Sequence, residues 1–338
     1  MARITILGAG ITSLSIAYSL PKSHRITILA SDLPGDLPHS QTWASPHACA
    51  GWVALGGLNP LEEQMQLDAL CFLRRLAITN PESGVRRARV TDVHDEPDAN
   101  GPWYRNRVPG YSEQEQQSQE GKDGSASLVT SYGSVVIDPS VLLPWLRREL
   151  ESQGVEFVRV GRVERLSELG FAGGDVVVNA SGLGSLALAD VADDQVVSDR
   201  TYTVRVRSRF EGMFVRRGKG HQYTYVFGRG DGTAVLGGIS DPVGDKVRTS
   251  EEVRAEIIRR AHENLAEYFP SADPSDYEVV EDMVGIRPLR FAGVRVEKET
   301  IGGQNVVHAY GTTIGGYIHS FGLARQAARL VDDFLFQL

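Results

Sequence analysis

With 338 residues, the chain is long enough to bury a large core, and this length favours about two domains. Hydrophobic residues make up 41% of it and charged residues 23%, as in ordinary globular proteins. A formal net charge of −8 argues against a nucleic-acid partner, since no basic excess is present to neutralise phosphates. Two cysteines, and no apolar run of about 20 residues, exclude a disulfide framework, a cysteine metal site and a membrane span.

The first twenty residues predict a strand, a glycine turn and a helix. Residues 3–7 are largely apolar and β-branched, residues 8–13 form the turn, and the helix continues until Pro21. Such a turn lets backbone N–H groups approach a pyrophosphate, whose negative charge the helix N-terminus favours. A second strand, 25–29, ends near Asp32, about 20 residues past the glycines, where an acid that binds a ribose is expected. These features predict a nucleotide cofactor, and Ser13 in place of the third glycine predicts looser packing of helix on strand.

Residues 33–60 are rich in Pro, Ser, His and Gly, which predicts a long functional loop whose small residues could lie against a flat ligand. Asn59 then caps a helix, and Cys71 is predicted to be one of its core residues. From 92 to about 125, Asp, Glu, Gln, Pro and Gly dominate, so we expect an exposed excursion that contributes no core. The apolar face predicted for the helix comprises Leu61, Met65, Ala69, Phe72 and Leu76.

A second glycine turn follows a second buried strand. A helix is predicted to start near Pro139 and to end before Gly154. The apolar run 175–180 then predicts a strand buried on both faces, and it leads into Ser181 and Gly182. Asn179 fits a glycosylation pattern, which we interpret as a false positive. Two glycine turns at the carboxyl ends of buried strands fit one extended cofactor.

From about residue 201 the pattern becomes antiparallel. Residues 222–227 are predicted to pair with 233–238, and Thr249 with Glu252 forms a capping box for the next helix. The chain then returns to glycine-rich segments at 284–290 and 306–317, the second of which precedes the last helix. The positive N-terminal end of that helix would favour an anionic reduced cofactor.

Several motifs follow one another in a fixed order along nearly the full chain. They are Ile6–Gly10, Asp32–Pro34, Gln41–Thr42, Ala44–Pro46, Val177–Gly184, Tyr225, Leu236–Gly238, Val284–Pro288 and His308–Gly311 with Gly316, Tyr317 and Gly322. In this order they resemble the D-amino acid oxidase family of flavoenzymes, and most closely its fungal and yeast members. The resemblance implies non-covalent FAD and oxidation of a D-amino acid by hydride transfer to flavin N5. Oxygen then yields hydrogen peroxide, and the imino acid hydrolyses to a 2-oxo acid and ammonia.

The resemblance also implies a fold class and a division of the chain. The fold is expected to be α/β, with a Rossmann-like FAD-binding domain and a second, mainly antiparallel substrate domain. The FAD-binding domain would comprise residues 1–90, 135–195 and 283–338, and the substrate domain residues 91–134 and 196–282.

Arg287 is the residue expected to bind the substrate carboxylate, because a guanidinium can donate two parallel hydrogen bonds to it. Tyr225 would support the same carboxylate, and Tyr223 and Gly316 would complete the substrate site. No acid or base is expected, and His308 and His319 are interpreted as structural. The cofactor-binding residues are expected to be Gly8, Ala9, Gly10, Ile11, Thr12, Ser31, Asp32, Gln41, Thr42, Ala50, Gly51, Ser181, Gly182, Gly315, Gly316, Tyr317 and Ile318.

The preferred substrate is predicted to be a neutral D-amino acid. A D-aspartate oxidase is the alternative, because the basic loop at Arg216, Arg217 and Lys219 could pair a second carboxylate. Against it, Ser240 stands where those enzymes tend to carry arginine. A glycine or sarcosine-type amine oxidase and a flavoprotein without catalysis remain open, the latter because Ser13, His47 and Tyr202 depart from the family pattern.

The expected partners are the substrate and O2, without nucleic acid, membrane or metal, and a homodimer is left open. The N-terminal core strand and a C-terminus unlike S-K-L predict an intracellular protein, cytoplasmic or peroxisomal.

Overall fold

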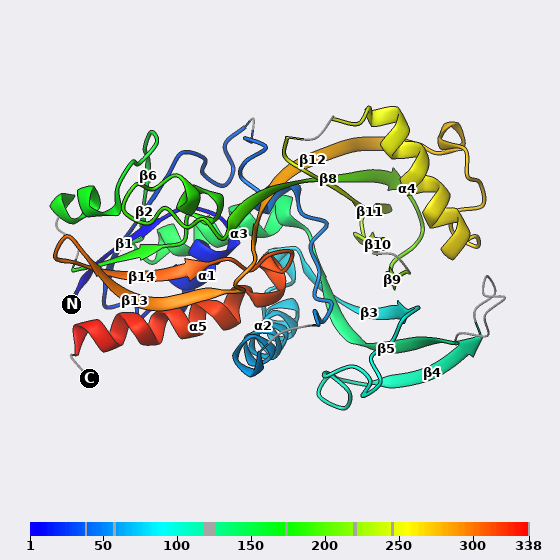
Figure 1. The fold of residues 1–338 in the computed structure, drawn as a ribbon, viewed down its shortest axis with the longest axis horizontal. Helices are drawn as coiled ribbons and strands as arrows, with labels where there is room; N and C mark the ends of the chain where they lie inside the picture. Colours follow the sequence, from blue (N-terminus) through cyan, green and yellow to red (C-terminus); the bar gives the residue numbers. More distant parts are fainter. Residues whose placement is uncertain are drawn as a thin grey trace.

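The computed structural model describes residues 1–37, 39–56, 59–117, 126–172, 175–218, 222–244 and 247–336. Two β-sheets organise these residues and lie at opposite ends of the view in Figure 1. Parts of the predicted loops at 33–60 and 92–125, and the last two residues of the C-terminus, lie outside the described residues.

Parallel strands build most of the first sheet. Its strands are β1 (Arg3–Leu7), β2 (Arg25–Ala30), β6 (Glu156–Arg159), β7 (Val176–Asn179), β13 (Arg295–Ile301) and β14 (Gln304–Tyr310). The order is β13–β14–β7–β1–β2–β6, and only the β13–β14 pair is antiparallel. β1 lies between β7 and β2, so every residue of β1 after Arg3 is buried. This position explains why its sequence is largely apolar rather than alternating.

Four helices accompany this sheet: α1 (Ile11–Ser19), α2 (Pro60–Thr79), α3 (Pro139–Ser152) and α5 (Gly316–Leu335). α5 packs against both α1 and α2. Gly322 permits the close contact with α2, because a Cβ there would lie 1.9 Å from the carbonyl oxygen of Met65. The predicted helix ends are confirmed, since Asn59 caps α2 and Gly154 follows α3 with φ of +85°. None of the helices in the described ranges is long and apolar enough to cross a membrane.

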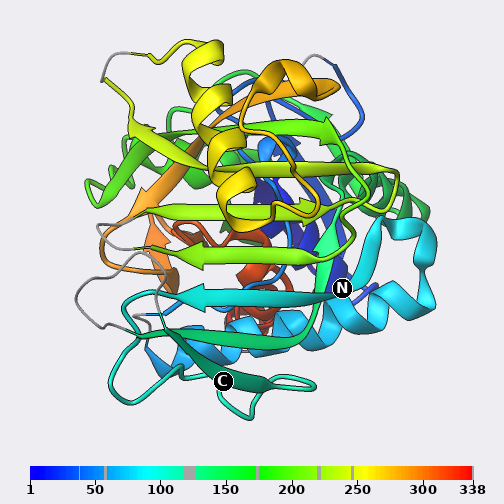
Figure 2. The ribbon, with the colours of Figure 1, turned by 90° about the vertical axis from the view of Figure 1, so that its right-hand side faces the viewer.

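The second sheet has eight strands and is mainly antiparallel. They are β3 (Val85–His94), β4 (Ser112–Gln117), β5 (Ala126–Ile137), β8 (Val196–Arg207), β9 (Met213–Arg217), β10 (Tyr223–Gly228), β11 (Thr233–Pro242) and β12 (Val279–Arg290). Their order is β12–β8–β11–β10–β9–β3–β5–β4, with β3 and β9 parallel. The predicted pairing of β10 with β11 is confirmed. Helix α4 (Ser250–Asn264), with the predicted capping box at Thr249, lies across one face of this sheet (Figure 2).

Strand alternation gives the second sheet two different faces. On β8, Tyr202 and Val204 belong to the apolar cluster under α4. Thr201 and Thr203 point to the other face and line a cavity. Because successive side chains of a strand alternate between faces, the same rule places Tyr225 on the cavity side and Val226 under α4.

Three expectations about the core are wrong. Leu61, placed on the apolar face of α2, is 45% exposed in the first turn of the helix. Cys71 is exposed, because α2 buries the side that meets α5 and the second sheet, and Cys71 lies off that side. The polar stretch after Asp92 does contribute core: Tyr104 is 2% exposed and Val108 6%. The Tyr104 hydroxyl lies 3.2 Å from a carboxylate oxygen of Asp92 and 3.1 Å from the Thr130 hydroxyl, so this ring is buried with its polar atom satisfied.

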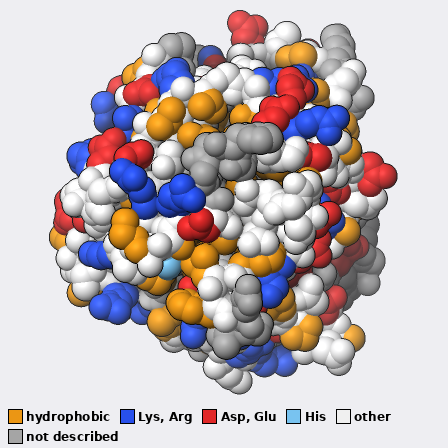
Figure 3. All heavy atoms as spheres, turned by 90° about the vertical axis from the view of Figure 1, so that its left-hand side faces the viewer, with side chains coloured by type: hydrophobic (Ala, Val, Ile, Leu, Met, Phe, Trp, Pro, Cys, Tyr) orange, Lys and Arg blue, Asp and Glu red, His pale blue; other side chains and the backbone are white. Residues whose placement is uncertain are grey.

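The predicted domain boundaries remain a prediction. β3 enters the second sheet at Val85, so the stretch 1–90 contributes to both sheets. At the end of the molecule that carries the first sheet, positive and negative side chains are interspersed among the described residues of the surface (Figure 3).

Candidate active site

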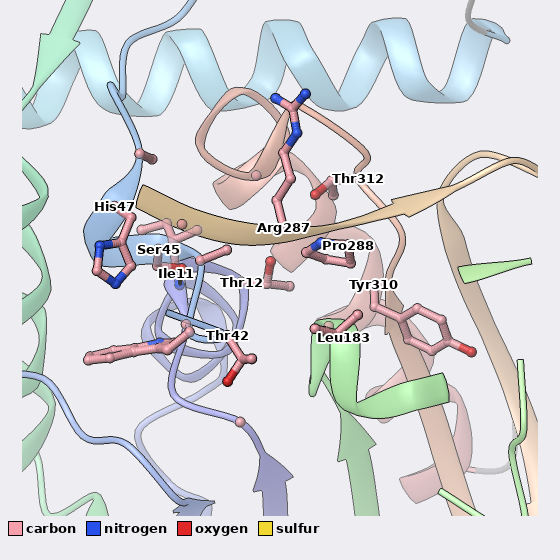
Figure 4. A pocket seen from close by; sticks show the side chains of 18 of the residues that line it. Ile11, Thr12, Thr42, Ser45, His47, Leu183, Arg287, Pro288, Tyr310 and Thr312 are labelled. Atoms are coloured by element: carbon pink, nitrogen blue, oxygen red, sulfur yellow. Dashed lines mark hydrogen bonds between the residues drawn. The ribbon is translucent and has the colours of Figure 1, made fainter. Parts of the chain in front are cut away.

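One long cavity of about 820 Å³ runs from the carboxyl ends of the parallel strands to the open face of the second sheet. Ligands of open α/β sheets bind outside the carboxyl ends of the strands, which is where this cavity begins. Its volume is in the range of cofactor and substrate pockets. Figure 4 shows one part of it, with the N-terminus of α1 below β12.

The glycine turn brings the backbone of α1 to the cavity. Gly8 has φ of +108°, and a Cβ there would lie 2.5 Å from the carbonyl oxygen of Ala180, so only glycine fits. The backbone N–H of Ile11 donates to the hydroxyl of Ser45, which stands over the helix end (Figure 4) at 3.0 Å. Gly10, at the N-cap, has no side chain that could accept from the next N–H groups of the turn. Apart from that of Ile11, the N–H groups of this first helical turn therefore remain for an anion in the cavity.

Ser13 does not loosen the packing of α1, contrary to the sequence-based expectation. It is fully buried, and its hydroxyl donates to the carbonyl oxygen of Ala180 at 3.3 Å. The small side chain fits the space of the missing glycine and binds the end of β7 instead of displacing it.

Asp32 lies at the predicted place, at the end of β2. Its carboxylate accepts hydrogen bonds from the backbone of Ser40 at 3.2 Å and the hydroxyl of Ser31 at 3.1 Å. Arg162 lines the same end of the cavity. Its segment is held there because the backbone N–H of Val160 donates to the carbonyl oxygen of Ala30, at the end of β2. This end thus has a carboxylate and a guanidinium that a nucleoside could contact.

The N-terminus of α5 forms another part of the wall. Gly316, Tyr317 and Ile318 line the cavity, and no side chain caps the start of the helix. Thr313, in the turn before α5, has φ of +52°, and Ala50 in the facing loop has φ of +43°. Positive φ is costly for a β-branched residue, and such strain concentrates at functional sites.

Nearly all the predicted cofactor residues line this one cavity; Gln41 and Gly315 do not. The Gln41 carbonyl oxygen instead accepts from the backbone of Ile286 on β12 at 2.8 Å. Gly315 has no room for a side chain because its Cβ would lie 2.6 Å from Nδ1 of His319.

The other end of the cavity holds three of the four predicted substrate residues; the fourth, Gly316, begins α5. Tyr223 and Tyr225 project from β10, and Arg287 from β12. Tyr225 packs closely against Gly237, where a Cβ would be only 2.5 Å from the phenol. Burial raises the pKa of both tyrosines, so their hydroxyls stay protonated and can donate.

Arg287 has an ionic partner that the sequence did not indicate. Its Nε and Nη2 both donate to one carboxylate oxygen of Asp199, at 2.9 and 2.6 Å. In Figure 4 the guanidinium points away from the α1 N-terminus. The group is therefore held at the far side of the cavity from the anion site.

The two described arginines of the predicted basic loop are already paired. Arg216 donates to Asp95 at 2.9 Å, and Arg217 donates to the buried Asp92 at 3.0 and 2.9 Å. Burial alone would raise the pKa of Asp92, but Arg217 and His94 outweigh it and hold that pKa below the ordinary value. Lys219 lies outside the described residues.

The two histidines interpreted from the sequence as structural lie away from the cavity. His308 and His319 are buried, do not line the cavity, and have pKa values lowered by burial, so both stay neutral. His47 lines the cavity, with its ring nitrogen 3.2 Å from the Ser40 carbonyl oxygen. Asn179 is fully buried, so its glycosylation pattern is indeed a false positive.

Sequence reasoning missed several polar residues. Ser45 lies in a quoted motif without having been assigned a role. Thr203, whose buried hydroxyl has no partner among the described residues, and Asp199 belong to no motif. Only the period-2 alternation of β8 could have placed them on the cavity face.

The site fits an elongated nucleotide cofactor. The Nε1 of Trp43 is buried without a partner in the described part of the chain, and it lies 3.8 Å from where a Cβ of Gly10 would be. An unsatisfied donor beside a helix N-terminus suits a bound phosphate or ribose. With the strained turns and the carboxylate at Asp32, this end has the donors and the acceptor that such a group needs.

The comparisons with known proteins agree. The family model described as FAD dependent oxidoreductase (DAO) matches residues 3–330. A D-amino-acid oxidase of Fusarium vanettenii is 30% identical, over 97% of this chain and 96% of its own. A D-aspartate oxidase of Talaromyces thermophilus is 29% identical, over 97% and 95%. The solved structure of glycine oxidase from Geobacillus kaustophilus is similar in fold, with a TM-score of 0.71 at 18% identity over 100% of this chain and 95% of that one.

These matches confirm the predicted fold class, a Rossmann-like FAD-binding part joined to a second sheet. They also confirm the predicted resemblance and cofactor. The chain belongs to the FAD-dependent oxidoreductase family.

Proposed function

We propose that the protein is a D-amino acid oxidase that acts on neutral D-amino acids. The observation that carries this proposal is the position of Arg287 beside Tyr225, at the end of the cavity remote from the α1 N-terminus. A guanidinium binds a carboxylate through two parallel hydrogen bonds, and Tyr225 can donate another. Together they would fix the α-carbon of an amino acid in one orientation.

The residues around the cavity would hold FAD in an extended form. The N-terminus of α1, with Ser45 and Thr42, would bind the pyrophosphate, and Asp32 would accept hydrogen bonds from a ribose. The positive end of α5 would favour negative charge on the cofactor. FAD bound here would supply the acceptor for a hydride from the substrate, and with O2 and water the D-amino acid would yield a 2-oxo acid, ammonia and hydrogen peroxide.

The chain contributes position rather than acid–base chemistry. The two tyrosines have raised pKa values and act as donors, while His308 and His319 lie away from the cavity. The substrate amine would lose its proton to solvent before the reaction. Holding the carboxylate in a fixed place then supplies the orientation that the reaction needs.

The charges of the pocket favour neutral side chains. Among the described residues that line the cavity, Arg287 and Arg162 are the lysine or arginine residues, and Arg162 lies at the nucleotide end. Arg216 and Arg217 already have carboxylate partners. A second substrate carboxylate would therefore meet no further lysine or arginine among the described residues that line the substrate end of the cavity, and desolvating it would be costly.

An anaerobic titration tests the proposal. The purified yellow protein is mixed with D-alanine or D-methionine, and the flavin absorption in the blue region is followed before and after air is admitted. We expect bleaching, followed by recovery of the colour and release of hydrogen peroxide. L-alanine is the matched control, and it should not bleach the flavin.

Other results would refute the proposal in distinct ways. A preference for D-aspartate would refute the neutral specificity. Turnover of sarcosine or glycine without any D-amino acid would indicate an amine oxidase of another type. A yellow protein that none of these substrates reduces would lack the proposed catalysis.

A further inference from the structure

Asp199 lies on the cavity face of the second sheet, directly opposite Arg287. The register of the antiparallel strands β8 and β12 pairs these two residues, and it pairs Thr201 with Gly285. The hydroxyl of Thr201 donates to the Gly285 carbonyl oxygen at 3.1 Å, which fixes the register next to the pair. Side chains of directly opposed residues share a face, so the contact is set by the backbone.

The geometry of the contact leaves one edge of the guanidinium free. Asp199 occupies the edge formed by Nε and Nη2, through a single oxygen. A guanidinium has five N–H donors, so the two N–H groups of Nη1 and the second one of Nη2 are left. In the described part of the chain no acceptor is hydrogen-bonded to Nη1, and Arg287 lines the cavity. The Nη1–Nη2 edge is thus the one available for a bidentate carboxylate.

The pair also sets the local charge. The Asp199 side chain is 8% exposed and that of Arg287 29%, so solvent screens their interaction only in part. Before a substrate binds, the two charges cancel. One bound carboxylate then gives this end of the cavity a single negative charge, and a second carboxylate would add to it. The remaining described lining around Arg287 and the two tyrosines contains no further arginine, lysine or carboxylate; its other polar groups include His47, Cys49 and hydroxyls.

We propose that Asp199 is a positioning and specificity-determining residue, which presents the Nη1–Nη2 edge of Arg287 to the substrate carboxylate and disfavours substrates that carry a second one. This inference rests on the proposed function, because it takes Arg287 as the residue that binds the substrate. It assigns to one buried carboxylate both the orientation of the arginine and the rejection of acidic side chains.

Two substitutions separate these roles. Asp199→Asn keeps an oxygen that can accept from Arg287 but removes the charge, whereas Asp199→Leu removes both. We expect D199N to lower the KM for D-alanine severalfold and to raise the ratio of kcat/KM for D-aspartate over D-alanine at least tenfold. We expect D199L to raise the KM for D-alanine, because the guanidinium loses its orientation.

Asp282→Asn is the matched control. Asp282 lies on β12, the strand of Arg287, and like Asp199 it pairs with an arginine, but that arginine is Arg254 of α4, on the other face of the sheet. It should leave the substrate ratio unchanged. If the ratio of kcat/KM for D-aspartate over D-alanine in D199N stays within twofold of the wild-type value, the inference is overturned. The proposed function would still stand in that case, provided that the wild-type protein oxidises D-alanine. A wild-type protein that oxidises no D-amino acid would overturn both.

Discussion

Removal of the Arg287 side chain should lower activity and stability for two separable reasons. A bidentate carboxylate receives two charge-assisted hydrogen bonds, each worth about 1.5–3 kcal/mol. Their loss amounts to about 3–6 kcal/mol, or roughly 10²- to 10⁴-fold in kcat/KM at 1.36 kcal/mol per tenfold. We therefore expect Arg287→Ala to retain FAD but to lose most of its activity on D-alanine.

The stability effect follows from Asp199, which would be left buried and unpaired. Breaking a buried ion pair costs about 3–5 kcal/mol, and the partial exposure of Arg287 favours the lower end, about 3 kcal/mol. At about 2.1 cal/mol/K per residue, the 338 residues have an unfolding entropy of about 0.7 kcal/mol/K. The Tm should therefore fall by about 4 °C.

The double variant R287A/D199N distinguishes the two effects. Replacing the orphaned carboxylate by an amide should restore most of the Tm, because no buried charge then lacks a partner, whereas activity should stay low. Thermal unfolding at a fixed excess of FAD and a peroxide-coupled assay measure the two quantities. Near-native turnover by Arg287→Ala would show that the carboxylate site lies elsewhere, and an unrestored Tm would show that Asp199 is not the source of the instability.

Three further substitutions test other parts of the structure. Gly8→Ala should weaken FAD binding measured by fluorescence titration, because its Cβ would meet a backbone carbonyl oxygen. The control Gly35→Ala, with positive φ but open space, should lose only about 1 kcal/mol of stability. Equal FAD affinities of the two variants would contradict this reasoning. Asp92→Asn leaves the charge of Arg217 buried without its anion and should lower the free energy of unfolding by about 3–5 kcal/mol, seen as a lower Tm; an unchanged Tm would contradict it. Burial lowers the pKa of His319, so the unfolded state takes up a proton first as the pH falls, and the free energy of unfolding should decline below about pH 6.5. His319→Asn should therefore flatten the dependence of Tm on pH in this range. An unaltered slope of Tm against pH would exclude this histidine as a cause.

Local signals were sufficient for most elements of the fold. The glycine turn at Gly8, the cap at Asn59 and the capping box at Thr249 each depend on residues within four positions of one another, and each appears in the structure. Helical periodicity was a less accurate guide to which residues of α2 are buried. A helical stripe defines a face only to within a residue or so, and Cys71 lies just outside the side that packs.

Long-range pairing set the limit of prediction at the candidate site. Arg287 and Asp199 are 88 residues apart, and only the register of two antiparallel strands brings them together. The arginines at 216 and 217 resembled a basic loop, but they end a strand. Neighbours on a strand point to opposite faces, so each meets a different aspartate.

The strand order of the first sheet has a consequence for the biosynthesis of the protein. β14 pairs with β7, and α5 packs on α1, so residues 304–335 complete a sheet whose central strand is formed by residues 3–7. During translation, the N-terminal glycine turn emerges long before the segment that closes the cavity around it. Contacts between residues so far apart in the sequence form slowly during folding. Capture of the cofactor should therefore be a late, largely post-translational event, and the nascent chain must keep the apolar flank of α1 covered by other means until then.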